Sequence, residues 1–386
     1  MSTQTGRPPA PHPSLRREFR SVLVSEHERK GRLPFLVNDF VIEEQLCHLR
    51  CSYCLTEDYN LLMEVPDAQI RLTTDARDTW HAVLDHFHNH VDCPVLRVSG
   101  GEFFWLKKSA EFIQECAGIY ETVQIITNGV LLRNKLDQLA APGNVQLNIS
   151  LDGHTNELNR YRFTKRQPKL LGVVLENLAR AVELGIKVDI QCVLTDANVE
   201  HQLSFAEFLA DLYPSGVTLY FFPARGTAAK RFAYEPGNYL DAVVERYDDL
   251  SPVLPPRAFV EHIAEQLRRG ERTLPCHITA MMAQLFATGD VSACPHAWID
   301  PMVNIVDEPD SLPDLVGEHP HYHFFMQRRP RFSFCKKCAT PSDVVNLYLM
   351  DIITDAEIAA CHLYSGEQTL VRLRELKELY APAIAG

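Results

Sequence analysis

Apolar and polar positions alternate along the first part of the chain in a pattern that predicts strands separated by helices. Short apolar runs bounded by turn residues predict strands at 35–43, 95–102, 123–129, 145–153, 187–195 and 217–223. Apolar residues at helical spacing predict helices near 76–91, 108–120, 171–182 and 202–212. Strands that alternate with helices in this way indicate βαβ units and a parallel sheet. Six such units are fewer than the eight of a closed barrel, so we predict an α/β fold built on an open, partial (β/α)6 barrel.

The alternation stops after residue 250, which divides the chain into three predicted regions. Residues 1–34 contain many Pro and Arg residues and are interpreted as a mobile tail. Residues 35–250 would form the barrel, and residues 251–386 a smaller extension that ends in helices. Within the extension, the run LFATGDVSACP, with Gly289 and Asp290 at its centre, predicts a β-hairpin.

Charge and composition exclude several classes of partner. The net charge of −12 and the lack of a long basic run speak against nucleic acid or an anionic membrane as the main partner. No stretch approaches the ~20 apolar residues of a membrane span, and the N-terminus lacks the apolar core of a secretory signal. We therefore expect a cytoplasmic protein, in which 11 cysteines suggest metal ligation rather than disulfides.

The loop after the first predicted strand carries three closely spaced cysteines. Cys47, Cys51 and Cys54 follow C-x3-C-x2-C spacing in the stretch EEQLCHLRCSYCLTEDY. Three thiolates this close can bind one face of a cubane iron–sulfur cluster, whereas ordinary clusters of that kind take four cysteine ligands. A trio would leave one iron open to a ligand that is not protein. The alternatives are three unconnected cysteines or part of a zinc site, although zinc ligands usually come in C-x2-C pairs.

Together with Tyr53, an aromatic residue just before the third cysteine, this stretch resembles the signature loop of the radical SAM superfamily. The resemblance implies that Cys47, Cys51 and Cys54 hold a [4Fe–4S] cluster whose open iron chelates S-adenosylmethionine (SAM). One-electron reduction, by a carrier such as flavodoxin or ferredoxin, would then cleave a C–S bond and free a 5′-deoxyadenosyl radical that abstracts a substrate hydrogen. The resemblance also implies the partial (β/α)6 barrel, with the site at the carboxyl ends of its strands.

Further motifs at predicted strand ends resemble those with which this family binds SAM. Gly100-Gly101-Glu102 is similar to the motif that holds the methionine amino group, with Phe103 where the family usually has proline. Ser150-Leu151-Asp152-Gly153, followed by Arg162, resembles a pattern in which the serine and the arginine bind the carboxylate. Read without the family, these motifs are also compatible with ordinary turns and a solvated arginine. The resemblance implies SAM contacts at Tyr53, Gly100, Gly101, Glu102, Asn128, Asn148, Ser150, Arg162, Val193 and Thr195.

Polar residues alternate with apolar residues along two neighbouring predicted strands. In a barrel the apolar face of each strand meets the helices, so the polar face is expected to line the lumen. Buried polar groups need partners, which favours a hydrophilic substrate over a lipid, although water or neighbouring side chains could also satisfy them. Besides the SAM contacts, the predicted substrate residues of the lumen are Gln146, Asp189 and Gln191.

A second group of cysteines lies in the extension. Cys276 and Cys294 flank the predicted hairpin, and Cys335 and Cys338 form a C-x2-C pair. Four such thiolates could enclose either zinc or a [4Fe–4S] cluster. Behind a radical SAM core, the spacing resembles the twitch extension, a shorter relative of the SPASM extension, which implies one auxiliary [4Fe–4S] cluster with four protein ligands. Three histidines between the two pairs could bind metal or form a polar insertion loop: His319, His321 and His323.

Three reactions are compatible with these predictions. The first is dehydrogenation of a small polar alcohol, such as a sugar or aminocyclitol in natural-product biosynthesis, with the auxiliary cluster accepting the second electron. The second is epimerisation, which needs a thiol as hydrogen donor; Cys93, Cys116 and Cys192 are interpreted as core or surface residues, which leaves Cys361. The third is peptide modification, disfavoured because only ~35 residues precede the barrel, too few for an independent leader-binding fold. A scaffold without catalytic function would leave the SAM motifs without a role.

Overall fold

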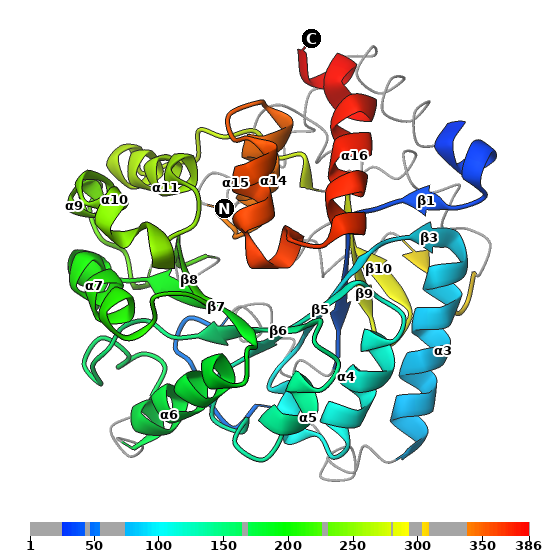
Figure 1. The fold of residues 1–386 in the computed structure, drawn as a ribbon, viewed down its shortest axis with the longest axis horizontal. Coiled ribbons are helices and arrows are strands. Elements are labelled where there is room, and N and C mark those ends of the chain that lie inside the picture. The colour runs from blue at the N-terminus through cyan, green and yellow to red at the C-terminus, as the bar shows by residue number, and fades with distance from the viewer. Residues whose placement is uncertain are drawn as a thin grey trace, which may run out of the picture.

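A single large sheet forms the centre of the molecule (Figure 1). The computed structural model describes residues 25–42, 47–54, 74–163, 169–225, 231–278, 281–292, 303–308 and 338–385. Within these residues the large sheet has nine strands, in the order β11-β10-β9-β2-β4-β5-β6-β7-β8. A separate pair of short strands, β1 (Leu33–Pro34) and β3 (Val91–Asp92), lies beside it.

The six predicted strands are confirmed and run parallel to one another in chain order. Their outward-facing apolar side chains, such as Leu147 and Ile149, are fully buried because the helices pack against this face. Sequential parallel pairing brings all six carboxyl ends to one edge of the sheet. The strands are β2 (Val37–Val41), β4 (Val95–Ser99), β5 (Thr122–Thr127), β6 (Val145–Ser150), β7 (Lys187–Leu194) and β8 (Val217–Pro223).

Helices surround the outside of this sheet, as Figure 1 shows. The four predicted helices are confirmed as α3 (Thr74–His90), α4 (Ser109–Ala117), α6 (Leu170–Glu183) and α7 (Gln202–Leu212). The short α5 (Leu136–Ala140) was not predicted, because five residues are too few to show helical periodicity. Beyond β8 the ring continues with α9 (Asp241–Glu245), α10 (Tyr247–Leu250) and α11 (Arg257–Arg269). The result is the open, curved α/β arrangement expected of a partial barrel.

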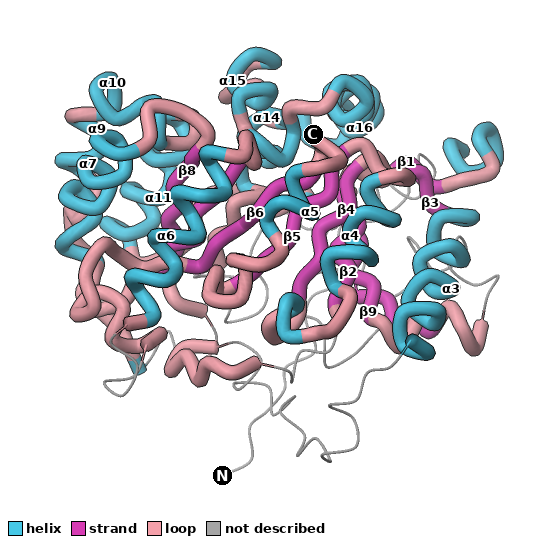
Figure 2. Tube along the Cα trace, turned by 60° about the horizontal axis from the view of Figure 1, so that its bottom comes forward, coloured by secondary structure: helices cyan, strands magenta, loops and turns pink. Residues whose placement is uncertain are grey.

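The C-terminal helices close the end of the barrel at which the strands begin (Figure 2). They are α14 (Asp343–Leu349), α15 (Asp355–Ala360) and α16 (Glu367–Ala385). Lys187, the first residue of β7, donates to Ser365 Oγ at 2.9 Å. Glu121, just before β5, accepts from the backbone N–H of Gln368 at 2.7 Å and of Thr369 at 2.8 Å. The opposite end, where the strands finish, therefore stays available for a site.

The predicted hairpin is present, and it extends the barrel sheet. Strand β9 (Met282–Phe286) pairs in antiparallel fashion with β10 (Asp290–Ser292), which pairs with β11 (Val303–Asn304). Gly289 at the turn has φ +91°, a left-handed conformation that favours glycine. The sequence did not reveal that β9 also pairs in parallel with β2, so that the extension and the barrel share one sheet.

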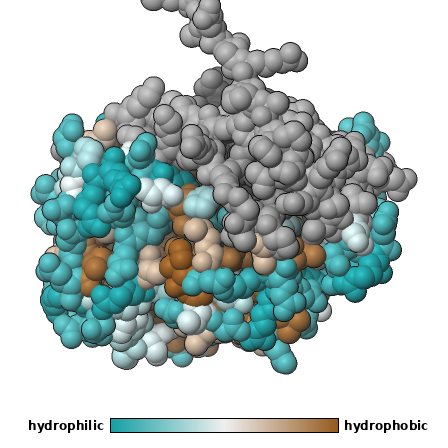
Figure 3. All heavy atoms as spheres, turned by 90° about the horizontal axis from the view of Figure 1, so that it is seen from above, coloured by the Kyte–Doolittle hydropathy of each residue, from teal (hydrophilic) through white to brown (hydrophobic). Residues whose placement is uncertain are grey.

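The surface is largely polar. On the face drawn in Figure 3, hydrophilic residues predominate over the described part and apolar residues gather only in small patches. Among the described helices, none combines the length and the apolar composition that a membrane span requires. Residues 25–30, at the end of the predicted tail, form a short helix, and residues 1–24 lie outside the described part.

Candidate active site

A cavity of about 270 Å³ lies at the carboxyl ends of the strands. Its wall includes residues from the three-cysteine loop, from the ends of β4 to β8 and from the extension. Parallel strands finish at the same edge, so side chains far apart in the sequence meet here. Residues of the predicted site that line this cavity are Cys47, Cys51, Tyr53, Cys54, Gly100, Gly101, Asn128, Ser150, Arg162, Gln191 and Val193.

The three cysteines form one wall of the cavity. Their loop is fixed by backbone bonds from Ser52 N to Tyr161 O at 2.8 Å and from Cys54 N to Cys51 O at 3.0 Å. Burial raises the pKa of Cys51 to about 12, against the opposing influence of the Arg162 charge, so a metal would have to displace its proton. Among the described residues no three His, Cys, Asp or Glu side chains converge as a single ion would require. Thiols that share a cavity wall are nevertheless suited to a cluster, in which each thiolate binds a different iron.

Arg162 connects the cysteine loop to the ends of β6 and β7. Its guanidinium donates to Asp152 Oδ1 at 3.3 Å, approaches Cys51 Sγ at 3.9 Å and lies 5.5 Å from the centre of the Tyr53 ring. Asp152 also accepts from Tyr53 Oη and, at 3.1 Å, from the backbone N–H of Val193. Among the described residues, the Nε of Arg162 is buried without a hydrogen-bond partner. An unpaired buried donor of this kind favours a bound acceptor, such as a carboxylate.

Glu102 ties the end of β4 to the end of β5. Its carboxylate accepts from Thr127 Oγ1 and from Asn128 N, both at 2.8 Å, and from Phe104 N at 3.2 Å. Glu102 is only 1% exposed, and burial raises its pKa. Gly100 and Gly101 line the cavity, whereas Glu102 lies behind them. Its contact with the SAM amino group therefore stays a prediction, and its visible role is to shape the wall.

Sequence reasoning missed a polar floor of the cavity. Asp39 of β2 and Arg97 of β4 face each other across the two strands and form a buried ion pair. Gln284 of β9 and Thr340 of the extension also line the cavity. The available signal was one charged residue at the centre of each apolar run, FLVNDFVIE and VLRVS. Charged residues are rarely buried in strands unless they are paired. Asp39 and Arg97 could therefore have been predicted to pair, and their two strands to be neighbours.

Comparison with known proteins assigns a family to the part of the chain that carries the cysteine loop. Residues 45–209 match the family model described as the radical SAM superfamily. These residues are a radical SAM domain. The matched range contains the three cysteines, the strand ends β4 to β7 and Arg162, and so covers much of the wall of the large cavity.

Curated relatives share sequence with this chain over part of their length. The GTP 3′,8-cyclase of Aquifex aeolicus is 29% identical over 180 residues, which cover 45% of this chain and 52% of that protein. Molybdenum cofactor biosynthesis protein 1 of Dictyostelium discoideum is 34% identical over 152 residues, or 38% of this chain and 22% of that protein. The chain thus spans about half the length, or less, of the curated relatives it matches.

Solved structures share the fold at low sequence identity. SuiB of Streptococcus suis, in a crystal structure with bound S-adenosylmethionine, aligns with a TM-score of 0.58 at 14% identity, over 82% of this chain and 75% of SuiB. The enzyme anSMEcpe, with bound AdoMet and a peptide, aligns with a TM-score of 0.56 at 15% identity, over 90% of this chain and 99% of its own. At these identities the likeness concerns the fold alone.

Two of the predicted substrate residues, Gln146 and Asp189, lie too deep in the barrel to line the cavity. Gln146 Nε2 donates to the backbone oxygen of His362 at 2.7 Å, and Asp189 Oδ1 lies 2.9 Å from His362 Nδ1. Both residues are near the start of their strands, where the C-terminal segment fills the barrel. The assignment of Gln146 and Asp189 to the substrate site is therefore corrected, whereas Gln191, further along β7, lines the cavity. The alternation of polar and apolar residues predicted which face of each strand points into the barrel, but not how far along the barrel each residue lies.

Two predicted SAM contacts also lie away from the cavity. Asn148 is 1% exposed, and its Oδ1 is buried without a partner. Thr195 is held by Asn198, whose Oδ1 accepts from Thr195 N at 2.8 Å and from Thr195 Oγ1 at 3.2 Å. Neither residue lines the cavity. Asn148 keeps an acceptor that a ligand deeper in the barrel could reach, whereas Thr195 shapes the loop after β7.

Cys361 is buried inside the barrel and does not line the cavity in which a hydrogen donor would have to act. It is 2% exposed, its Sγ lies 3.5 Å from Glu357 O, and burial raises its pKa to about 12. It directly precedes His362, which contacts the beginnings of the strands, whereas the cysteine trio lies at their ends. The structure therefore does not support Cys361 as the hydrogen donor of an epimerase. The other described cysteines outside the two groups are buried as expected: Cys93, Cys116 and Cys192.

The described half of the second cysteine group lies next to the cavity. Arg272 donates to the backbone oxygen of Cys338 at 2.8 Å, and its charge opposes the burial that raises the pKa of Cys276 to about 12. Thr340 and Pro341, just after Cys338, line the cavity. The remaining residues of this group and of the histidine tract lie outside the described residues: Cys294, Cys335, His319, His321 and His323. The auxiliary cluster thus remains a prediction.

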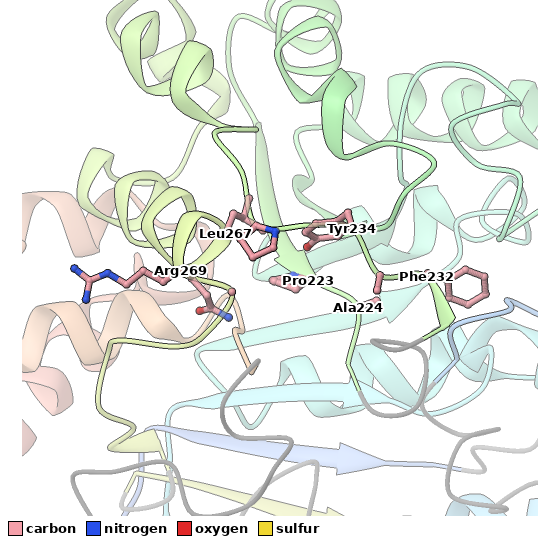
Figure 4. Close-up of a pocket in the computed structure, with 10 residues that line it drawn as sticks. Pro223, Ala224, Phe232, Tyr234, Leu267 and Arg269 are labelled. Carbon is pink, nitrogen blue, oxygen red and sulfur yellow. The ribbon is translucent and has the colours of Figure 1, made fainter.

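A smaller cavity of about 230 Å³ lies beside the first and shares Pro223 with it. Figure 4 shows Pro223, Tyr234 and Leu267 gathered around it, with Arg269 extending away. Gln266, which lines this space, donates to Cys338 O at 3.5 Å. The end of β8 and the extension therefore meet here as well as in the large cavity.

Proposed function

We propose that this chain cleaves SAM reductively in the large cavity and uses the resulting radical to remove a hydrogen atom from a small polar molecule. The observation that carries the proposal is the convergence of Cys47, Cys51, Cys54 and Arg162 on one cavity within a radical SAM domain. A [4Fe–4S] cluster held by the three cysteines would supply the electron that breaks a C–S bond of SAM.

The chain's own residues would position SAM and keep water away from it. The unpaired Nε of Arg162 and the hydroxyl of Ser150 can donate to the methionine carboxylate. Asp152 holds the Arg162 side chain in place. Burial alone would lower the pKa of Arg162, but the charge and hydrogen bond of Asp152, together with Tyr53 and Cys51, raise it above its ordinary value, so the guanidinium stays charged. Tyr53, 7% exposed, packs against Arg162 and covers the cysteine loop. These contacts need no rearrangement when the ligand binds.

The polar floor supports a hydrophilic substrate. Gln191 and Gln284 carry amide groups, and the pair Asp39–Arg97 lies beside Gln284, which is the register partner of Asp39. Oxidation of a sugar or aminocyclitol alcohol fits this lining: the carbon loses a hydrogen atom to the radical and then a proton and an electron to give a carbonyl. A second cluster on the extension cysteines would supply the acceptor for that electron. Among the described residues, cysteines outside the two groups do not line the cavity, which disfavours epimerisation.

A second candidate is cyclisation of a purine nucleotide, supported by the relatives that are named GTP 3′,8-cyclase. Arg97 and Arg225 both line the cavity and would suit a phosphorylated substrate. Peptide modification has weaker support, because SuiB with its precursor peptide is similar at only 15% identity.

Anaerobic incubation of the reconstituted protein with SAM and dithionite should yield 5′-deoxyadenosine, measured by liquid chromatography and mass spectrometry. The rate should rise when a polyhydroxylated substrate is added, with one carbonyl product for each 5′-deoxyadenosine. Stimulation by GTP instead, with a cyclised nucleotide product, would select the second candidate. A protein that forms no 5′-deoxyadenosine with any substrate would refute the proposed activity.

A further inference from the structure

An exposed tryptophan lies against the three-cysteine loop. The rings of His48 and Trp105 are stacked, with centroids 5.2 Å apart and planes inclined by 21°. His48 directly follows Cys47, and Trp105 lies in a short 3₁₀ helix, Phe103–Trp105, just after Gly101 of the cavity wall. Trp105 is 47% exposed, whereas Trp80 is 6% exposed in the core. An aromatic pair thus extends from a predicted cluster ligand to the solvent.

Basic side chains accompany Trp105, although the chain as a whole is acidic. Lys107 and Lys108 follow it directly and are exposed. Lys135 Nζ lies 5.9 Å from the centre of the Phe104 ring and donates to Ser109 Oγ at 3.0 Å, so the segment that contains exposed Arg133 packs against the same turn. On a chain with a net charge of −12, such a concentration of positive charge is a local exception.

We propose that Trp105, Lys107, Lys108 and Arg133, here called the Trp105 surface, form the docking site of an acidic one-electron carrier protein of the flavodoxin or ferredoxin class. This inference rests on the proposed function. The reduced carrier loses one electron and the cluster bound by Cys47, Cys51 and Cys54 gains it; no bond or proton is exchanged. The stacked His48 and Trp105 would place the carrier next to the ligand loop.

The features of this surface match those of transient redox complexes. Interfaces between electron-transfer partners are small, and one exposed aromatic residue among charges is sufficient to anchor them. Tryptophan is enriched among the residues that dominate binding energy. Surrounding positive charge increases the association rate with an acidic partner and makes it sensitive to salt. A neutral or basic partner would gain nothing from Lys107 and Arg133.

The test compares two reductants with the same reconstituted protein. Trp105→Ala should raise the dissociation constant of flavodoxin about thirtyfold, as expected for loss of a central tryptophan. Lys107→Glu/Arg133→Glu should raise it about tenfold and remove most of its salt dependence. Binding is measured by biolayer interferometry, and carrier-dependent 5′-deoxyadenosine formation should fall in parallel. With dithionite, which needs no docking site, both variants should cleave SAM at the parent rate.

Matched controls lie at the opposite end of the barrel. Ile119→Ala removes another exposed apolar side chain just after α4, and Lys187→Glu reverses an exposed lysine at the start of β7. Neither control should change flavodoxin binding. Unchanged affinity and carrier-dependent rate in the Trp105 and Lys107/Arg133 variants would overturn the docking site. Absence of SAM cleavage with dithionite in the parent protein would refute the proposed function instead, and carrier binding would still be measurable.

Discussion

Replacing Cys47, Cys51 and Cys54 together with alanine is expected to halve the iron content and abolish 5′-deoxyadenosine formation. The parent protein should bind about eight irons after anaerobic reconstitution, as two four-iron clusters would. The three cysteines share one cavity wall, so their removal eliminates every protein ligand of one cluster and leaves the extension cysteines intact. Iron is measured by colorimetric assay and inductively coupled plasma mass spectrometry.

The control for this variant is Cys361→Ala, which removes a buried thiol that does not line the cavity. It should keep the full iron content and the parent rate. An unchanged iron content in the triple variant would mean that the trio holds no cluster. Zinc in place of the second set of irons would refute the auxiliary cluster while leaving the SAM site intact.

Asp343→Ala is expected to lower the free energy of unfolding by about 3–5 kcal/mol, the cost of leaving a buried charge without its partner. Asp343 is fully buried, and its Oδ1 lies 2.5 Å from Arg272 Nη2. The same carboxylate accepts from Thr340 N at 2.9 Å and from Asn346 Nδ2 at 2.6 Å. Its loss would therefore release the segment that carries Cys338 and lines the cavity. Urea unfolding followed by circular dichroism measures the change.

Two further variants separate the buried pair from ordinary surface charges. Arg272→Met/Asp343→Leu removes both charges and should recover much of the lost stability. Arg374→Ala breaks an exposed pair with Asp355, in which both side chains are 52% exposed, and should cost at most about 1 kcal/mol. Equal losses in Asp343→Ala and Arg374→Ala would contradict the structural role of Asp343.

Low pH is expected to reduce the stability contributed by the Arg272–Asp343 ion pair. Burial by itself would raise the pKa of Asp343, but the charge and hydrogen bond of Arg272, together with His262 and the backbone N–H of Thr340, outweigh burial and hold this pKa below its ordinary value. A carboxyl group with a lowered pKa stabilises the fold at pH values above its unfolded pKa, and this contribution is lost as the pH falls through the folded pKa. The difference in stability between the parent and the Arg272→Met/Asp343→Leu variant should thus shift in favour of the variant only in strong acid.

The barrel could be predicted from the sequence because each of its elements shows its own local signal. Strands such as VQLNIS and helices such as Leu170–Glu183 display their periodicity within one segment. That the cysteine trio and Arg162 lie together at the carboxyl ends of the strands could be predicted because their spacing resembles that of one family. In each case the information lies within a short stretch of the chain.

What escaped prediction depends on contacts between distant segments. Nothing near Gln146 or Asp189 shows that the segment around His362 fills the start of the barrel. The same segment buries Cys361, which does not line the cavity. Likewise, β9 beside β2 and the pair Asp39–Arg97 depend on strand neighbours that a single sequence does not specify. Such pairings are decided by tertiary packing rather than by local propensity.

The most direct measurement of the central proposal is the electron paramagnetic resonance spectrum of the reduced protein with and without SAM. The Cys276→Ala/Cys338→Ala variant is used, because it removes the described ligands of the second group and leaves the cluster on Cys47, Cys51 and Cys54 as the source of the signal. We expect a reduced [4Fe–4S] spectrum whose g values shift when SAM binds to the open iron, and no such signal when the trio is also replaced. A spectrum that SAM leaves unchanged, or that persists without the three cysteines, would contradict the assignment.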